Sequence, residues 1–336
     1  MRTPGRVVFI GAVHEAAPAL SALLESDAEV DAVFTLPAAR AGSSSGFVDL
    51  APLAQRHRVP VIHAEDINAP SIVAHIQRLH PDLVVVVGWT RLLGKQLLSI
   101  PPRGCIGFHA SLLPRHRGRA PVNWAILRGE TRTGNTMFML TPEADMGDIV
   151  DQRVVGIEDD DTCADVYAKV GAAGAEMLRT HLTALLAGAA IRMPQTAGDA
   201  EPLRKRTPAM GITAWDRPAR DVHNWIRALT LPYPGAFSHV RERKVMLWCS
   251  AVPGLDEPAG VPGSIMSCDA QGMRVGTRDG SLLVTAVFDA GASPQPAHRW
   301  FEHAGLAPGA AFDPVDELTA RWALGAGPAP VISSRW

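Results

Sequence analysis

The feature that most limits the possible folds is a series of short apolar runs without polar alternation. Residues 7–10 (VVFI) and 83–87 (LVVVV) are two such runs, and shorter ones occur at 33–34 and 59–62. A strand that is apolar on both faces is typical of a parallel sheet that helices cover on both sides. Because helix-like stretches separate the runs, we predict a Rossmann-like, doubly wound α/β domain with a mainly parallel sheet.

The same domain is expected to continue well beyond residue 100. Further strands are predicted at 105–108, 136–140 and 149–155, followed by one long helix over 161–186. The residues after the first strand begin with Gly11 but do not form a GxGxxG pattern. A dinucleotide cofactor is therefore not expected.

Composition changes near residues 193–208, where Pro, Thr and basic residues replace the helical pattern. We therefore predict a first, larger domain over 1–195, a linker over 196–208, and a smaller domain over 209–336. In the last range, a helix is expected at 217–229, with strands at 236–240, 245–250, 273–276 and 282–287. Short strands separated by Gly, Asp and Pro indicate a small antiparallel, OB-like β-barrel.

Charge and composition narrow the possible partners. From residue 201 onward the chain has 14 Lys/Arg and 13 Asp/Glu, and the Gly/Ser-rich loop expected at 37–46 is scarcely basic. A domain that grips tRNA through phosphates should be distinctly basic, so a tRNA partner is not expected from the charge. Apolar runs are too short to span a membrane, and Met1 to Gly5 do not begin a signal peptide. These observations predict a cytoplasmic protein.

The four cysteines lie far apart and include no CxxC pair. Neither a disulfide framework nor a zinc site is expected, and no metal is assigned.

One His and one Asp stand where chemistry is expected. His109 ends a buried strand, which is where open α/β sheets bind ligands, and Asp145 in an Asp-x-Gly turn can reach the same crevice. A carboxylate beside an imidazole orients the ring and stabilises its cation during proton transfer. From these residues alone, a structural His and a turn Asp are an equally good interpretation.

Around these residues the chain resembles the formyltetrahydrofolate-dependent formyltransferases, which include methionyl-tRNA and sugar N-formyltransferases. The family pattern Asn-x-His-x-Ser-Leu-Leu-Pro, Arg-Gly, Asp-x-Gly is matched in order by His109, Ser111 to Pro114, Arg117-Gly118 and Asp145-Met-Gly147. Residues 222–228 and 232–237 resemble the accessory barrel of the tRNA and sugar enzymes.

The resemblance implies transfer of a formyl group from 10-formyltetrahydrofolate to an amine. His109 would take the amine's proton or stabilise the oxyanion, and Asp145 would orient it. The implied folate and substrate contacts are Arg91, Leu92, Leu93, Gly107, Ser111, Arg119, Thr141, Pro142, Glu143 and Ala144. Candidates for contact with the acceptor are Trp89, Arg117 and Asn123. Ser111 lacks a G-x-S-x-G elbow and is interpreted as ordering the Leu-Leu-Pro turn rather than as a nucleophile.

The acceptor is less constrained than the donor. Residues 117–125 are most similar to the sugar-modifying branch, so the main expectation is a small amine such as an amino-sugar nucleotide. Methionyl-tRNA formyltransferase is the alternative. A formyl-folate hydrolase and a non-catalytic folate-binding homologue are further alternatives, and a homodimer is left open.

The chain departs from the family pattern at Gly107, where the relatives carry the Asn that donates to the developing oxyanion. Removal of one such donor typically costs about 2.7–4 kcal/mol of barrier. Another donor such as Asn123, backbone N–H groups or water could substitute, the acceptor could be more reactive, or the chemistry could have changed. We expect the vacated volume to be re-used for the substrate or for a water.

Overall fold

The computed structural model describes residues 5–196, 201–254 and 259–330, and the chain divides into two compact units. The first unit comprises Met1–Pro121, Arg132–Gly156 and Asp165–Leu203, and the second comprises Val122–Thr131, Ile157–Ala164 and Arg204–Trp336. The interpretation of the sequence had assigned 122–131 and 157–164 to the first domain. Part of the expected linker, residues 197–200, lies outside the described residues.

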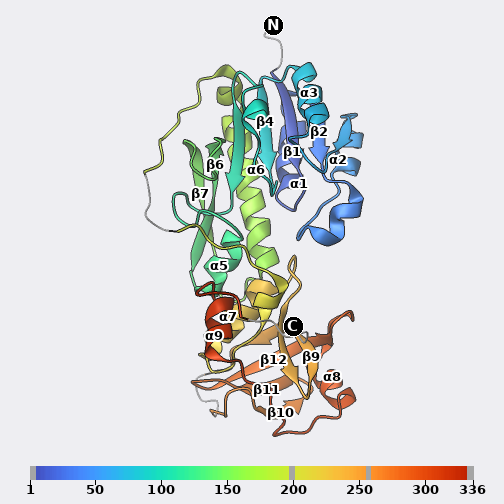
Figure 1. The fold of residues 1–336 in the computed structure, drawn as a ribbon, viewed down its shortest axis with the longest axis vertical. Helices are drawn as coiled ribbons and strands as arrows, with labels where there is room; N and C mark the ends of the chain where they lie inside the picture. The colour runs from blue at the N-terminus through green and yellow to red at the C-terminus, as the bar shows by residue number, and fades with distance from the viewer. Residues whose placement is uncertain (1–4, 197–200, 255–258, 331–336) are drawn as a thin grey trace. The chain divides into compact units, whose positions relative to one another are not determined.

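A seven-stranded sheet forms the centre of the first unit (Figure 1). Its strands are β1 (Arg6–Gly11), β2 (Glu29–Thr35), β3 (Val61–His63), β4 (Leu83–Val87), β5 (Cys105–His109), β6 (Arg132–Met139) and β7 (Ile149–Gly156). They lie in the order β3-β2-β1-β4-β5-β6-β7. Strands β1 to β5 pair in parallel, whereas β6 pairs antiparallel with β5 and β7 pairs antiparallel with β6. The mainly parallel, doubly wound fold predicted from the apolar runs is confirmed.

Both faces of this sheet are buried, as continuous apolar strands require. Successive side chains of a strand point to opposite faces, so Val7 and Phe9 join one core while Val8 and Ile10 join the other. The first core includes residues of α1 (Ala16–Leu24) and of the long helix α6 (Cys163–Ala187), and the second includes residues of α3 (Pro70–Leu79) and α4 (Lys95–Leu98). The helix expected over 161–186 is therefore confirmed.

The prediction of a loop over residues 37–46 was wrong in part. The Gly/Ser-rich stretch contains the 3-10 helix η1 (Ala38–Ser43), and α2 (Ala51–Arg56) follows it. Pro37 precedes η1 with φ −66°, and its fixed φ favours a turn of helix in the alanine-rich residues that follow.

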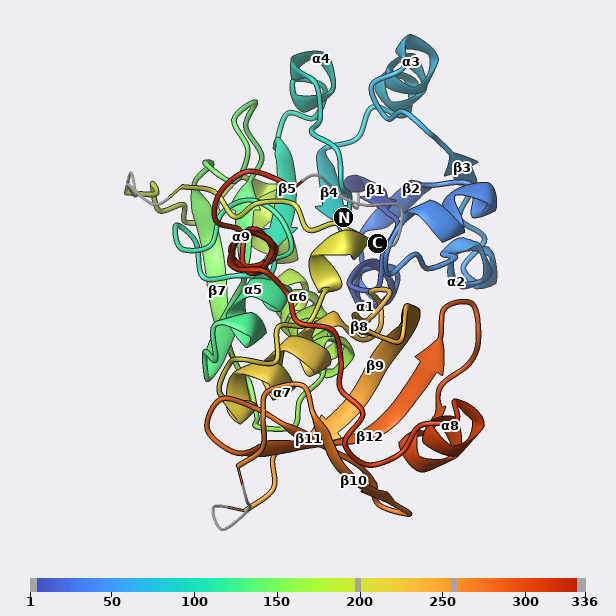
Figure 2. The ribbon, with the colours of Figure 1, turned by 60° about the horizontal axis from the view of Figure 1, so that its bottom comes forward.

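An antiparallel sheet forms the main part of the second unit (Figure 2). Its strands are β8 (Ala236–Val240), β9 (Arg243–Ala251), β10 (Ile265–Asp269), β11 (Gly272–Gly276), β12 (Ser281–Asp289) and β13 (Gln295–Pro296), in the order β10-β11-β12-β9-β8 with β13 on β12. The helical segments are α5 (Pro121–Leu127), η2 (Pro208–Gly211), α7 (Ala219–Leu229), α8 (Ala297–His303) and α9 (Glu317–Ala323). The four strands and the helix expected from the sequence are confirmed, whereas α5, α8, α9, β10 and β13 were not predicted.

Within the described ranges, no helix combines the length and apolar character needed to cross a membrane.

Candidate functional site

A pocket of about 330 Å³ opens at the carboxyl ends of β4 and β5 in the first unit. Ligands of open α/β sheets bind at this edge. The lining residues are Val86, Gly88, Trp89, Thr90, Arg91, Leu92, Leu93, Leu98, Gly107, Phe108, His109, Gly118, Arg119, Ala120, Pro121, Phe138, Leu140, Thr141, Glu143, Ala144 and Asp145. An apolar wall with a few convergent polar groups is the usual composition of a small-molecule site.

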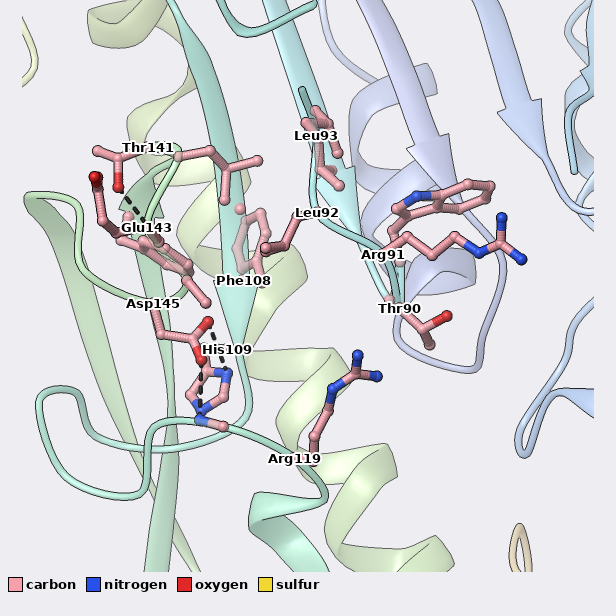
Figure 3. A pocket seen from close by; sticks show the side chains of 18 of the residues that line it. Thr90, Arg91, Leu92, Leu93, Phe108, His109, Arg119, Thr141, Glu143 and Asp145 are labelled. Atoms are coloured by element: carbon pink, nitrogen blue, oxygen red, sulfur yellow. Dashed lines mark hydrogen bonds and ion pairs between the residues drawn. The ribbon is translucent and has the colours of Figure 1, made fainter. Parts of the chain in front are cut away.

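His109 and Asp145 face each other in this pocket (Figure 3). His109 Nδ1 lies 3.5 Å from Asp145 Oδ1, and His109 Nε2 lies 2.8 Å from the carbonyl oxygen of His116. A neutral imidazole can donate to only one of these oxygens, whereas a protonated ring satisfies both. The arrangement can therefore hold the cation that forms when His109 accepts a proton.

Asp145 is fixed by its neighbours in an unusual backbone conformation. Its φ is +56°, in the left-handed region that non-glycine residues rarely adopt. Its Oδ2 accepts a hydrogen bond of 3.0 Å from the backbone N–H of Gly118, and its carbonyl oxygen accepts one of 3.1 Å from Arg117 Nε. Two residues on, a Cβ at Gly147 would lie 1.7 Å from the Met139 carbonyl oxygen, so the Asp-x-Gly turn needs glycine there.

The space above Gly107 is filled by the protein itself. A Cβ built at Gly107 would lie 2.5 Å from Cδ2 of Leu140, the residue that follows β6. The expectation that this volume serves the substrate or a water was therefore wrong. The reason is the antiparallel pairing of β5 with β6, which brings Leu140 over the glycine; the Leu140 N–H donates to the Cys105 carbonyl oxygen.

Most of the residues implied by the resemblance are brought together here. The pocket includes Trp89, Arg91, Leu92, Leu93, Gly107, His109, Arg119, Thr141, Glu143, Ala144 and Asp145. It does not include Ser111, Pro142, Arg117 or Asn123.

For two of these four residues, Ser111 and Asn123, burial excludes the ligand contact that the resemblance implied. Ser111 is 0% exposed, and its hydroxyl donates to the Arg115 carbonyl oxygen, so it orders the turn and does not contact a ligand. Asn123 is also 0% exposed, belongs to the second unit and donates its amide to the Ala228 carbonyl oxygen at 2.6 Å. Asn123 therefore does not replace the missing donor at position 107.

Two arginines on the pocket lining keep their guanidinium groups available. Neither the Arg91 nor the Arg119 side chain has a hydrogen bond or ion pair within the described ranges. Figure 3 shows the Arg119 side chain extending past His109 into the pocket, and Arg91 beyond Thr90. Unpaired guanidinium groups are suited to carboxylate or phosphate groups of a ligand.

Reasoning from the sequence missed Leu140 and Gln195. Gln195 Nε2 donates to the carbonyl oxygens of Asp145 at 3.0 Å and Gly147 at 2.7 Å, and its Oε1 accepts from Arg117. Nothing in its local sequence could have identified it, because its partners lie about fifty positions earlier in the chain. Leu140 could have been found only from the register of β5 with β6.

Two family models match this chain. The family model described as Formyl transferase matches residues 5–182, and that of the Formyl transferase C-terminal domain matches 205–305. The methionyl-tRNA formyltransferase of Geobacter sulfurreducens is 35% identical over 308 residues, which cover 90% of this chain and 95% of that protein.

Two solved structures have a similar fold at lower identity. HypX from Aquifex aeolicus in complex with tetrahydrofolic acid is 20% identical with a TM-score of 0.64; the match covers 93% of this chain but only 49% of HypX. The N-formyltransferase from Helicobacter canadensis, in complex with folinic acid and dTDP-3-aminofucose, is 17% identical with a TM-score of 0.61, covering 83% of this chain and 98% of that one. The two family domains in order and the near full-length relative show that the chain belongs to the formyl transferase family of enzymes.

Proposed function

We propose that this enzyme transfers the formyl group of 10-formyltetrahydrofolate to a primary amine, with His109 as the proton acceptor. The observation that carries the proposal is the His109–Asp145 pair in a pocket at the carboxyl ends of β4 and β5. The pocket fits one end of a folate, because Leu93, Phe138 and Leu140 offer apolar contact and the loop from Thr141 to Ala144 offers backbone polar groups.

The roles of the residues follow from their contacts. In the neutral ring Nε2 carries the hydrogen, because it faces the His116 carbonyl oxygen, so Nδ1 holds the free lone pair. As the amine nitrogen bonds to the formyl carbon, His109 Nδ1 accepts the proton that the nitrogen loses. Asp145 and the His116 carbonyl oxygen hold the resulting imidazolium through its two N–H groups. The bond between the formyl carbon and the folate nitrogen then breaks, and His109 returns the proton to that nitrogen. Leu140 keeps water from the space above Gly107.

The comparisons support methionyl-tRNA as the acceptor better than an amino-sugar nucleotide. The relative at 35% identity over 95% of its own length is a methionyl-tRNA formyltransferase, whereas the solved sugar enzyme reaches only 17% identity. The amino-sugar nucleotide remains the second candidate, favoured by the even charge balance beyond residue 201.

Removal of either member of the pair tests the mechanism. We expect His109→Ala and Asp145→Ala each to lower turnover by more than about 100-fold, because both act on proton transfer. Asp145→Asn is the matched control for shape, and it should lose activity as well, because an amide does not stabilise the imidazolium. Tm values near that of the wild type show that the fold is intact, and near-normal turnover of either alanine variant would refute the assigned roles.

Turnover with defined amines tests the acceptor. The enzyme is supplied with 10-formyltetrahydrofolate and either methionyl-tRNA or a dTDP-linked amino sugar, and the formylated product is measured by mass. We expect formylmethionyl-tRNA. If only the amino sugar is formylated, the acceptor is an amino-sugar nucleotide and not methionyl-tRNA. Release of tetrahydrofolate without any formylated amine would indicate hydrolysis.

A further inference from the structure

We propose that Gln195 is a positioning residue that holds Asp145 in the orientation His109 needs, and that the segment after α6 is thus part of the catalytic machinery. The inference rests on the proposed function, since it assigns a role through Asp145. Gln195 itself does not line the pocket and does not touch His109 in the described structure.

The Gln195 side chain is hydrogen-bonded to the loop of Asp145 and Gly147 and to the side chain of Arg117. Its amide group donates to the Asp145 carbonyl oxygen at 3.0 Å and to the Gly147 carbonyl oxygen at 2.7 Å. Its carbonyl oxygen accepts from Arg117 Nη2 at 2.8 Å, and Arg117 Nε donates to the same Asp145 carbonyl oxygen at 3.1 Å. Gln195 and Arg117 therefore form one clamp with two donors on the backbone of Asp145.

Residues before and after Gln195 in the chain also form backbone hydrogen bonds near the proposed catalytic pair. Two residues before Gln195, Met193 exchanges two backbone hydrogen bonds of 2.8 Å with Ile149, the first residue of β7. Further along, the Leu203 N–H donates to the Arg117 carbonyl oxygen at 2.7 Å, and Leu203 accepts from the Arg119 N–H at 3.0 Å. Residues on both sides of Gln195 are therefore hydrogen-bonded to the start of β7 and to the loop of Arg117.

The clamp has a physical task because Asp145 is strained. At φ +56° Asp145 lies in the left-handed region, which is unfavourable for a residue with a side chain and persists where the surroundings fix it. The clamp holds the carbonyl oxygen of Asp145, while the Gly118 N–H holds its Oδ2. With both ends fixed, Oδ1 is directed toward His109 Nδ1. Without the clamp the loop can relax, and a displacement of about 1 Å in a catalytic group can cost about 100-fold in rate.

The test replaces Gln195 by Met, which keeps the length of the side chain but removes its hydrogen bonds. We expect kcat to fall about 10- to 100-fold while KM for the folate changes less than about threefold. The matched control is Gln152→Met, because Gln152 Nε2 also makes two hydrogen bonds, to the Leu113 carbonyl oxygen and Thr136 Oγ1, but none to the catalytic pair. Both variants should lose similar amounts of thermal stability, whereas only Gln195→Met should lose the larger part of kcat.

A double variant separates positioning from general destabilisation. In an Asp145→Ala background, Gln195→Met should reduce kcat by less than about twofold, because the residue it positions is absent. A full additional loss there, or equal losses of kcat in Gln195→Met and Gln152→Met, would overturn the inference. If Asp145→Ala itself retained normal turnover, the proposed function would fail instead, so the two failures are distinguishable.

Discussion

Gly107 and Leu140 compete for one space two residues before His109. Leu140 Cδ2 lies 2.5 Å and Cγ 3.1 Å from the position of a Cβ at residue 107, so any larger residue there must displace the leucine. Overpacking of this kind typically costs about 1–3 kcal/mol. The absence of a side-chain donor at residue 107 is thus coupled to the presence of an apolar residue at 140.

We predict that Gly107→Asn alone lowers turnover at least tenfold, because the new side chain forces Leu140 toward the folate pocket. The double variant Gly107→Asn/Leu140→Ala should recover most of that loss, since the amide then fits beside His109. Steady-state kinetics on the two variants and on Leu140→Ala measure this coupling. Unchanged turnover of Gly107→Asn would mean that Leu140 moves away freely.

At the scale of single residues, the sequence could predict the proposed catalytic pair, His109 and Asp145, but not the residues that support it. His109 is recognisable because it ends an apolar run, and Asp145 because an Asp-x-Gly turn precedes another strand. Gln195 and Leu140 act through contacts made by distant segments, which no local pattern encodes. Asn123 was misassigned because its neighbours resemble a binding motif although the side chain is buried in the second unit.

The half-buried guanidinium of Arg206 links helices α5 and α7. Arg206 lies between two indoles, with Cζ 4.8 Å from the ring centroid of Trp124 in α5 and 5.0 Å from that of Trp225 in α7. It also donates to the carbonyl oxygens of Ala323 and Met210. Burial lowers the pKa of Arg206 to about 10, so the side chain remains a cation at neutral pH.

We predict that Arg206→Met destabilises the protein by about 2–4 kcal/mol, because a desolvated cation–π contact and two charged hydrogen bonds are lost. Arg204→Met is the control: Arg204 is exposed, makes one hydrogen bond to the Gly327 carbonyl oxygen, and its loss should cost no more than about 0.5 kcal/mol. Denaturant unfolding followed by tryptophan fluorescence compares the variants. Equal midpoints for both would contradict the prediction.

Among the elements, those with strong local patterns were predicted and those that need a partner were not. The strand β4 is recognisable as five consecutive apolar residues. Helix α5 has seven residues, too few to show a helical period, and it is held by contacts such as Trp124 Nε1 to the Arg204 carbonyl oxygen. Strand β10 has five residues, of which only Ile265 is buried, so its pairing with β11 decides its structure.

The whole molecule has a nearly even charge, which limits how a nucleic acid can bind. Net charge is −2, and the part from residue 201 onward has 14 Lys/Arg against 13 Asp/Glu. Six to ten phosphate contacts would weaken binding about 10³- to 10⁵-fold between 50 and 200 mM salt. We predict that the Kd for methionyl-tRNA changes less than about tenfold over that range. Fluorescence titration at several salt concentrations tests this, and a thousandfold change would show an extensive phosphate interface.

The division of the chain into interleaved units affects how this protein can be recombined with its relatives. The chain passes between the units five times, and the second unit includes Val122–Thr131 and Ile157–Ala164 as well as Arg204–Trp336. Within that unit, Asn123 bonds to the Ala228 carbonyl oxygen, and Arg227 bonds to the carbonyl oxygens of Glu158 and Asp161. A chimera with a single crossover after Leu203 would combine these partners from two parents. An exchange of the accessory domain must therefore transfer all three segments together.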